Sequence, residues 1–117
     1  MNAFQELSGK VRQFADERDW AQFHSPKNLS MALSVECAEL MEHFQWLTEN
    51  QSRKLGSKKS REVEKELADV QIYLIRLSQV LGIDLMAASR KKLVGNARKY
   101  PVKKARGSAK KYTELRK

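Results

Sequence analysis

The sequence has a single cysteine and no long apolar run. Cys37 has no partner in the chain for a disulfide, which fits a reducing, intracellular setting, so we expect a cytoplasmic protein. No apolar run approaches the roughly 18 residues that a membrane span needs, and we expect no membrane association. The first residues show no basic start followed by an apolar segment, so no signal peptide is expected.

Several other patterns are missing from the 117 residues. No segment shows the alternation of a strand, and no internal repeat is found. There is no Cys/His ligand set for zinc and no Ser/His/Asp set for covalent catalysis. The length suits one domain with a modest core. We therefore predict an all-α protein with a four-helix-bundle-like subunit.

The net charge of +9 is concentrated at one end of the chain. Residues 1–89 hold 11 Lys/Arg and 13 Asp/Glu, whereas residues 90–117 hold 12 Lys/Arg and one acid. Such a block can bind phosphates, form a solvated tail or attract nucleic acid non-specifically. The sequence leaves these three interpretations open.

Helical spacing of apolar residues predicts four helices. Ser25-Pro26 is a start signal for the second, Gly82 ends the third, and Pro101 ends the fourth. We expect a connector over 18–24, a loop over 48–59, a domain over 1–101 and an extended or disordered basic tail over 102–117. The predicted helices cover residues 3–19, 26–47, 60–81 and 85–100.

Apolar residues on the second and third helices form more than one stripe. The predicted packing seam of the third helix contains five residues, Val63, Leu67, Val70, Leu74 and Leu77, and continues to Leu81. Helices that are apolar on several sides are buried on several sides. We therefore predict a homo-oligomer built on these two helices, because a further set lies away from the seams: Met31, Val35, Met41, Ile72, Ile75 and Val80.

Two pairs of carboxylates, each three residues apart, lie in the two most apolar stretches. Glu36 and Glu39 belong to the second predicted helix, and Glu66 and Asp69 to the third. Two carboxylates at this spacing can share one ion, and four oxygen donors suit Mg²⁺, with Mn²⁺ as a substitute. Surface ion pairs are the alternative. General acid/base work as in glycosidases ranks low, because a small bundle lacks a long cleft.

Flat side chains lie near the acidic flanks. Trp20, His24, Trp46 and Tyr73 could stack on a nucleobase, and the alternative is core packing or a subunit interface. On the fourth predicted helix, Lys92, Asn96 and Tyr100 recur at every fourth position. That face could meet triphosphate oxygens or be solvated.

Five segments carry recognisable motifs in chain order: Phe23-His24-Ser25-Pro26-Lys27-Asn28-Leu29, Glu36-Cys37-Ala38-Glu39-Leu40 to Phe44-Gln45-Trp46, Glu66-Leu67-Ala68-Asp69-Val70-Gln71-Ile72-Tyr73-Leu74, Asn96-Ala97-Arg98-Lys99-Tyr100-Pro101 and Lys111-Tyr112-Thr113-Glu114-Leu115. Together they resemble the MazG-like all-α nucleotide pyrophosphohydrolases, most closely the dCTP pyrophosphatase branch. The resemblance covers nearly the whole chain. It departs at Cys37, where a small or branched residue is more usual, and at Val11, where the eukaryotic branch has a histidine.

The resemblance implies a homotetramer, a dimer of dimers, with active sites between subunits. It implies Mg²⁺-dependent cleavage of a nucleoside triphosphate, dCTP or a modified dCTP, to the monophosphate and pyrophosphate, in housecleaning of the nucleotide pool. By motif position, the metal ligands would be Glu36, Glu39, Glu66 and Asp69, the base pocket Trp20, His24, Trp46 and Tyr73, and the phosphate or sugar contacts Lys92 and Asn96.

The residue types then suggest how water is activated. A carboxylate that the metal does not fully use can orient or deprotonate the attacking water, and we favour Glu39. The main alternative function is a basic helical module that binds RNA or single-stranded DNA through its tail, without catalysis. A non-catalytic member that only oligomerises ranks last, because all four acidic positions are filled. No specific nucleic-acid partner is expected.

Overall fold

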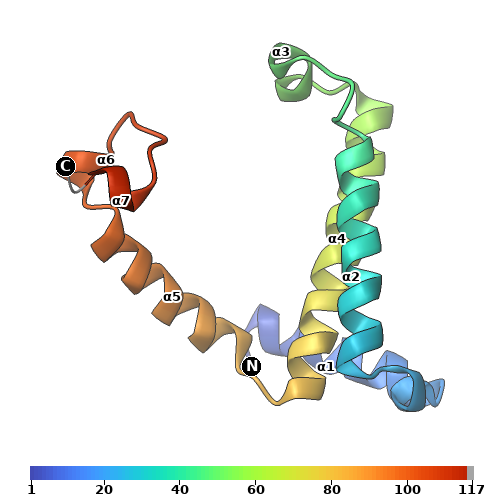
Figure 1. The fold of residues 1–117 in the computed structure, drawn as a ribbon. Helices are drawn as coiled ribbons and strands as arrows, with labels where there is room; N and C mark the ends of the chain where they lie inside the picture. The colour runs from blue at the N-terminus through green and yellow to red at the C-terminus, as the bar shows by residue number, and fades with distance from the viewer. Residues whose placement is uncertain (116–117) are drawn as a thin grey trace. The chain divides into compact units, whose positions relative to one another are not determined.

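The computed structural model describes residues 1–115, and every regular element in that part of the chain is helical (Figure 1). The all-α prediction is therefore confirmed. The chain divides into two compact units, one covering Met1–Ile83 and the other beginning at Asp84. The elements are α1 (Ala3–Glu17), the 3₁₀ helix η1 (Trp20–Phe23), α2 (Pro26–Glu42), α3 (Glu49–Arg53), α4 (Ser57–Leu81), α5 (Leu85–Lys99), α6 (Val102–Ala105) and α7 (Tyr112–Leu115).

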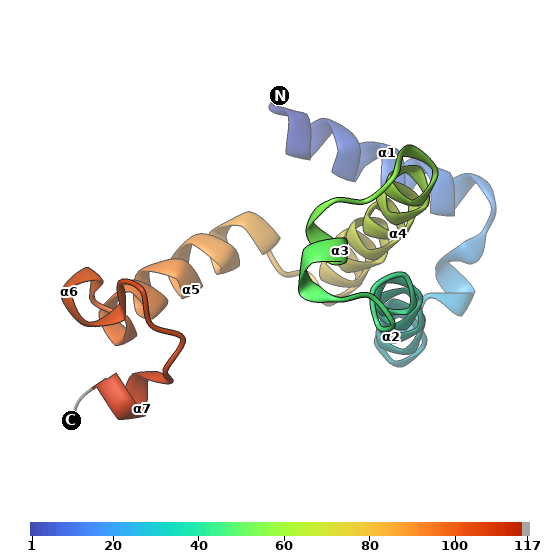
Figure 2. The ribbon, with the colours of Figure 1, turned by 90° about the horizontal axis from the view of Figure 1, so that it is seen from above.

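The first unit is built on an antiparallel pair of long helices. α2 and α4 run side by side along most of their length, and α1 packs across α4 (Figures 1 and 2). The buried apolar side chains of the described residues are Ala15, Leu29, Val63 and Ile75. Each of α1, α2 and α4 contributes to this small core, so α4 is the helix that joins the other two.

Local signals fix the entry into α2. The Ser25 hydroxyl accepts a hydrogen bond from the Asn28 backbone N–H at 3.1 Å, and Pro26 follows as the first helical residue. The Asn28 side chain also donates to the Phe23 carbonyl at 3.0 Å. These bonds tie η1 to the start of α2, which sets the position of His24 between them.

Helix boundaries differ from the sequence prediction at several points. α1 ends at Glu17, because Asp19 adopts a left-handed conformation with φ of 53°. α2 ends at Glu42 rather than Leu47, and residues 43–46 form turns. Part of the predicted loop over 48–59 is helical, because Thr48 and Gln51 form a reciprocal capping box that starts α3. α4 begins at Ser57, three residues before its predicted start.

The predicted seam of α4 is partly wrong. Ile75, which the prediction placed off the seam, is fully buried, whereas Leu67 and Leu74 of the seam are exposed. The reason is that α2 and α1 cover α4 from different directions, so its covered surface is wider than one stripe. Val63 is buried as predicted. The other off-seam residues are exposed in this single chain: Met31, Val35, Met41, Ile72 and Val80.

The second unit contains α5 and two short helices. Gly82, with φ of 67°, ends α4, and the Asp84 carboxylate accepts from the Ala87 backbone N–H at 3.0 Å to start α5. The expectation of an extended or disordered tail is wrong for 102–105 and 112–115, which form α6 and α7. The rings of Tyr100 and Tyr112 pack edge to face, 6.2 Å apart. The domain boundary at residue 101 stays a prediction.

No single helix within residues 1–115 has both the length and the apolar composition of a membrane span. α4 and α5 satisfy these criteria only when they are taken together as a bent pair.

Candidate metal and nucleotide site

Three carboxylates from two helices converge in the first unit. Glu36 and Glu39 lie one turn apart on α2, and Glu66 lies on α4. One oxygen of each can be chosen so that all three lie within 4.8 Å of one another, and all three residues are half-buried. The antiparallel packing of α2 against α4 brings them together. Three of the four predicted ligands therefore form one cluster.

The electrostatics of this cluster are unfavourable for three ionised carboxylates. Oε2 of Glu36 and Oε2 of Glu66 are buried and have no hydrogen-bond partner among the described residues. Burial raises the pKa of Glu36 to about 7, and the neighbouring Glu39, Asp69 and Glu66 contribute to the increase. A buried acceptor without a partner costs free energy, so the cluster needs a compensating charge.

A divalent cation fits this donor set. The cluster offers only hard oxygen donors, which Mg²⁺ prefers at about 2.0–2.1 Å, so two ligands on opposite sides of the ion lie about 4.2 Å apart. The three oxygens lie within 4.8 Å of one another, which is compatible with that separation. The two buried oxygens without partners are the atoms that an ion would satisfy. The residues present therefore fit the metal that the sequence motifs imply.

Asp69, the fourth predicted ligand, is exposed and is not part of this three-carboxylate group. Its charge nevertheless acts on Glu36 and helps to raise the pKa of that side chain. Asp69 also lines the adjacent pocket. It therefore lies between the acidic cluster and the aromatic side chains.

His43 borders the cluster on the other side. Lys59 Nζ lies 3.3 Å from His43 Nδ1, and because an ammonium only donates, Nδ1 accepts this hydrogen bond. His43 Nε2 lies 3.9 Å from Glu66 Oε1. His43 therefore contacts both a lysine and a carboxylate of the cluster.

A pocket of about 230 Å³ opens beside the cluster and is lined by residues of α1, η1 and α4. Trp20, His24 and Tyr73, three of the predicted base-binding residues, are among them. The rings of Phe14 and Trp20 lie edge to face at 5.5 Å, and those of Trp20 and His24 at 6.1 Å. The lining residues are Val11, Phe14, Ala15, Trp20, His24, Asp69, Ile72, Tyr73 and Arg76.

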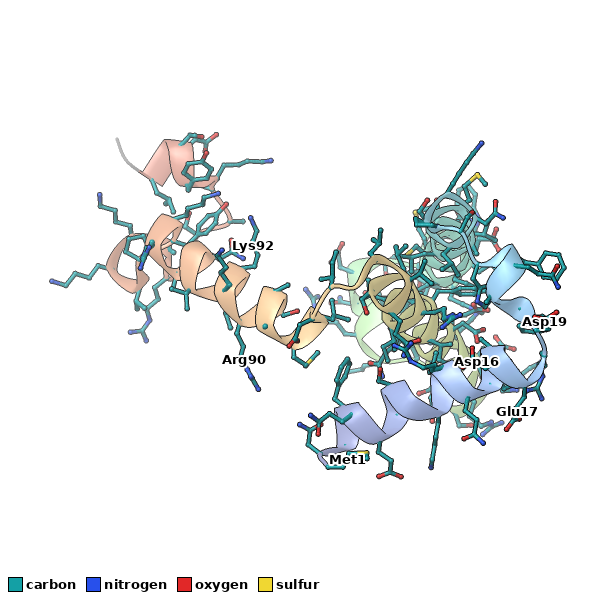
Figure 3. The ribbon with its side chains drawn as sticks, turned by 90° about the horizontal axis from the view of Figure 1, so that it is seen from below. Met1, Asp16, Glu17, Asp19, Arg90 and Lys92 are labelled. Carbon is teal, nitrogen blue, oxygen red and sulfur yellow. The ribbon has the colours of Figure 1, made fainter. Side chains whose placement is uncertain are left out.

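The other predicted substrate contacts do not line this pocket. Trp46 lies in the turns after α2 and is 86% exposed. Lys92 and Asn96 belong to the second unit, where they line a shallow groove along α5 together with Ala88, Ser89 and Leu93. Figure 3 shows Lys92 and Arg90 projecting from different sides of α5.

Arg76 is the pocket residue that sequence reasoning missed. Its Nε donates a hydrogen bond to His24 Nδ1 at 2.9 Å, and its side chain is almost fully buried. Burial and the charge of Arg76 lower the pKa of His24. The available signal was a single basic residue inside the apolar run from Leu74 to Leu77, since a charge in such a run needs a specific partner.

The fold and the acidic cluster agree with what sequence comparison shows. A profile described as "MazG-like family" matches residues 31–115. The chain therefore belongs to the MazG-like family, which confirms the resemblance read from the motifs.

Particular relatives narrow the similarity within this family. The chain is 45% identical over 105 residues to dCTP pyrophosphatase 1 of Homo sapiens and 46% identical to that of Mus musculus. Both alignments cover 88% of this chain and 62% of the relative, so the chain spans less than two thirds of these curated proteins. The crystal structure of a pyrophosphatase from Archaeoglobus fulgidus is similar with a TM-score of 0.81 and 40% identity, covering 86% of this chain and 94% of the other.

Proposed function

We propose that the protein is a metal-dependent nucleoside triphosphate pyrophosphohydrolase. It would cleave a (deoxy)nucleoside triphosphate, dCTP or a modified dCTP in preference, to the monophosphate and pyrophosphate. The observation that best supports this proposal is the three-carboxylate cluster, which has two buried oxygens without a hydrogen-bond partner and lies next to a pocket lined by aromatic rings. The relatives named dCTP pyrophosphatase and pyrophosphatase support this proposal.

Glu36, Glu39 and Glu66 would hold the ion, with Asp69 beside them as a further ligand. Mg²⁺, or Mn²⁺ in its place, supplies positive charge against the triphosphate oxygens and makes water more acidic. The raised pKa of Glu36 means that the cluster retains a proton near neutral pH until a cation replaces it.

The side chains of this chain would do three things in the reaction. Trp20, His24 and Tyr73 would hold the base in the pocket. Glu39 would accept the proton of a water whose oxygen forms the new bond to the α-phosphorus. The bond from that phosphorus to the pyrophosphate oxygen breaks, and the two products are the nucleoside monophosphate and pyrophosphate. No covalent bond to the protein forms in this scheme.

The chain alone leaves much apolar surface uncovered, which supports a homo-oligomer. Met31 and Val35 of α2 and Leu67 of α4 are each at least half exposed. Exposed apolar surface of this extent is typical of an interface. The proposed assembly is a homotetramer, a dimer of dimers, in the cytoplasm. In this assembly a second subunit covers these residues and the highly exposed Trp46. Trp46, Lys92 and Asn96 would then complete the base and phosphate contacts.

A second candidate function rests on the charge of the second unit. Residues 84–117 carry 12 Lys/Arg and two acids. A basic helical module of this kind binds single-stranded nucleic acid through phosphates, and its affinity falls steeply with salt. The acidic cluster of the first unit has no role in such a module, so we rank this function second.

The direct test is a panel of purified nucleoside triphosphates, each incubated with and without Mg²⁺, with pyrophosphate and monophosphate measured. We expect metal-dependent release of both products in equal amounts, with dCTP or a modified dCTP among the best substrates. Absence of turnover for every nucleotide, with the chain folded, would contradict the proposed enzyme. Binding of an oligonucleotide that disappears at high salt would then favour the second candidate.

A further inference from the structure

Arg76 connects the pocket to α1 through a chain of hydrogen bonds. Besides its bond to His24, its Nη1 donates to Gln79 Oε1 at 3.1 Å. The Gln79 amide in turn donates to the Ser8 carbonyl oxygen at 2.7 Å and to the Ser8 hydroxyl at 2.8 Å. The guanidinium is therefore fixed at both ends, by α1 on one side and by His24 on the other.

The burial of Arg76 is unusual for a charged side chain. Only 7% of its surface is exposed, and among the described residues it forms no ion pair with a carboxylate. The acceptors of its two hydrogen bonds, a ring nitrogen and an amide oxygen, are neutral. Burial of a charge without an opposite charge is costly. A role in packing alone would be served at lower cost by an apolar side chain.

The bond from Arg76 decides which nitrogen of His24 carries the proton. A guanidinium only donates, so His24 Nδ1 must present its lone pair, and the neutral ring holds its proton on Nε2. Within residues 1–115 no protein group accepts a hydrogen bond from Nε2. His24 lines the pocket, so Nε2–H is a donor available to a bound molecule.

We propose that Arg76 is a positioning residue for substrate: it holds His24 as the Nε2–H donor for a carbonyl oxygen or ring nitrogen of the bound base. The proposal rests on the proposed function, because it takes the ligand of the pocket to be a nucleotide. The lowered pKa of His24, caused by burial and by Arg76, is consistent with a ring that stays neutral. His24 contacts the base, and Arg76 acts through it.

The first experiment measures the tautomer directly, without turnover. The chain has two histidines, so ¹⁵N spectra of the imidazoles at pH 8 give two sets of signals, and the set lost in His24→Asn belongs to His24. We expect an unprotonated Nδ1 and a protonated Nε2, and titration with dCMP should shift the Nε2 signal. A proton on Nδ1, or saturation by dCMP without a shift at His24, would overturn the proposal.

The second experiment separates positioning from a purely structural role. Arg76→Met should raise KM about three- to tenfold, the effect of weakening one hydrogen bond, with kcat changed less than about twofold. In the His24→Asn background, Arg76→Met should add no further change in KM. Equal effects of Arg76→Met in both backgrounds would overturn the proposal.

Two controls make the outcome decisive. Arg12→Met replaces an exposed arginine of α1 and should leave KM unchanged. If Arg76→Met fails to fold, Gln79→Leu takes its place in the test. This variant keeps the guanidinium but removes the amide oxygen that accepts its hydrogen bond, and it should also raise KM. A wild-type chain that hydrolyses no nucleotide would contradict the proposed function, while the tautomer and the dCMP titration would still decide the role of Arg76.

Discussion

The first unit, residues 1–83, carries 11 Lys/Arg and 12 Asp/Glu, whereas residues 84–117 carry 12 Lys/Arg and two acids. All of the buried residues lie in the first unit, and none of the described residues of the second unit is buried. In the first unit, the charged side chains of the candidate site are therefore held in fixed positions, as Glu36 and Arg76 are. The second unit presents many charges on an exposed surface, where each is screened by solvent and salt.

This difference predicts where single substitutions matter. Removing one carboxylate from the acidic cluster disrupts a site whose other side chains are positioned around it. Removing one lysine from the second unit leaves many similar basic side chains in that unit. The following predictions test this contrast, beginning with the largest expected effect.

The acidic cluster should be most sensitive. Glu36→Gln should lower kcat about 10²-fold or more, since even residues that only support a metal ligand cost about 10–100-fold when they are changed. The matched control is Glu64→Gln, an exposed glutamate of α4, which should keep wild-type rates. Steady-state assays of dCTP hydrolysis with Mg²⁺ measure both. Wild-type rates in Glu36→Gln would remove this residue from the proposed ligands.

The apolar surface of the first unit should be the next most sensitive feature. Leu67→Glu places a charge on the proposed interface, so we expect a smaller particle in light scattering and loss of most activity. Asn50→Glu adds the same charge at an exposed polar position of α3 and serves as the control. A wild-type mass that equals one chain would contradict the proposed tetramer.

Metal affinity should depend on pH through Glu36. Its pKa is raised from 4.5 to about 7, so below pH 7 a cation must displace a proton, and affinity should fall up to about tenfold per pH unit. Without metal, the free energy of unfolding has the opposite pH dependence: it falls as the pH rises. The folded state holds this proton more tightly than the unfolded state, so Glu36 destabilises the metal-free fold as pH rises from 4.5 to 7. Mn²⁺ titrations and thermal melts between pH 5 and 8 measure both.

The cap of α2 should have a moderate effect on stability. Ser25→Ala removes the acceptor for the Asn28 N–H and should cost about 1 kcal/mol of unfolding free energy, measured by urea denaturation. Ser57→Ala, at the first position of α4 where the side chain makes no capping bond, is the control. Equal losses in the two variants would show that the Ser25 cap contributes nothing specific.

The tail should have the smallest effect on catalysis. Deletion of residues 103–117 should change kcat and KM by less than about twofold and abolish weak binding of single-stranded DNA at low salt, because the affinity of such a surface comes from phosphate contacts. A large rise in KM would instead assign substrate contacts to α6 or α7. The salt dependence of any remaining DNA binding shows how many basic groups still take part.

The elements that the sequence predicted well are those with strong local signals. Ser25-Pro26 and Gly82 mark boundaries of α2 and α4 that the structure confirms. Glu36, Glu39 and Glu66 come together as expected, because helical spacing and the apolar stretches around them limit where they can point.

The features that the sequence did not predict depend on packing between distant segments. Ile75 is buried because α1 covers a second side of α4, and periodicity within α4 carries no information about α1. The hydrogen bond between Arg76 and His24 joins residues 52 positions apart, so no local sequence pattern predicts it. Trp46 was predicted to line the base pocket on motif position, but in the single chain it is exposed, and only an assembled protein can test its role.

The central claim is that Glu36, Glu39 and Glu66 bind a divalent cation. The most direct test is a Mn²⁺ titration of the full chain at pH 8 by isothermal calorimetry, with paramagnetic broadening of assigned backbone amides read from the same samples. We expect saturable binding, with broadening centred on residues 36–39 and 66 and absent in Glu36→Gln. Broadening centred elsewhere, or binding of equal affinity in Glu36→Gln and in Glu64→Gln, would contradict the claim.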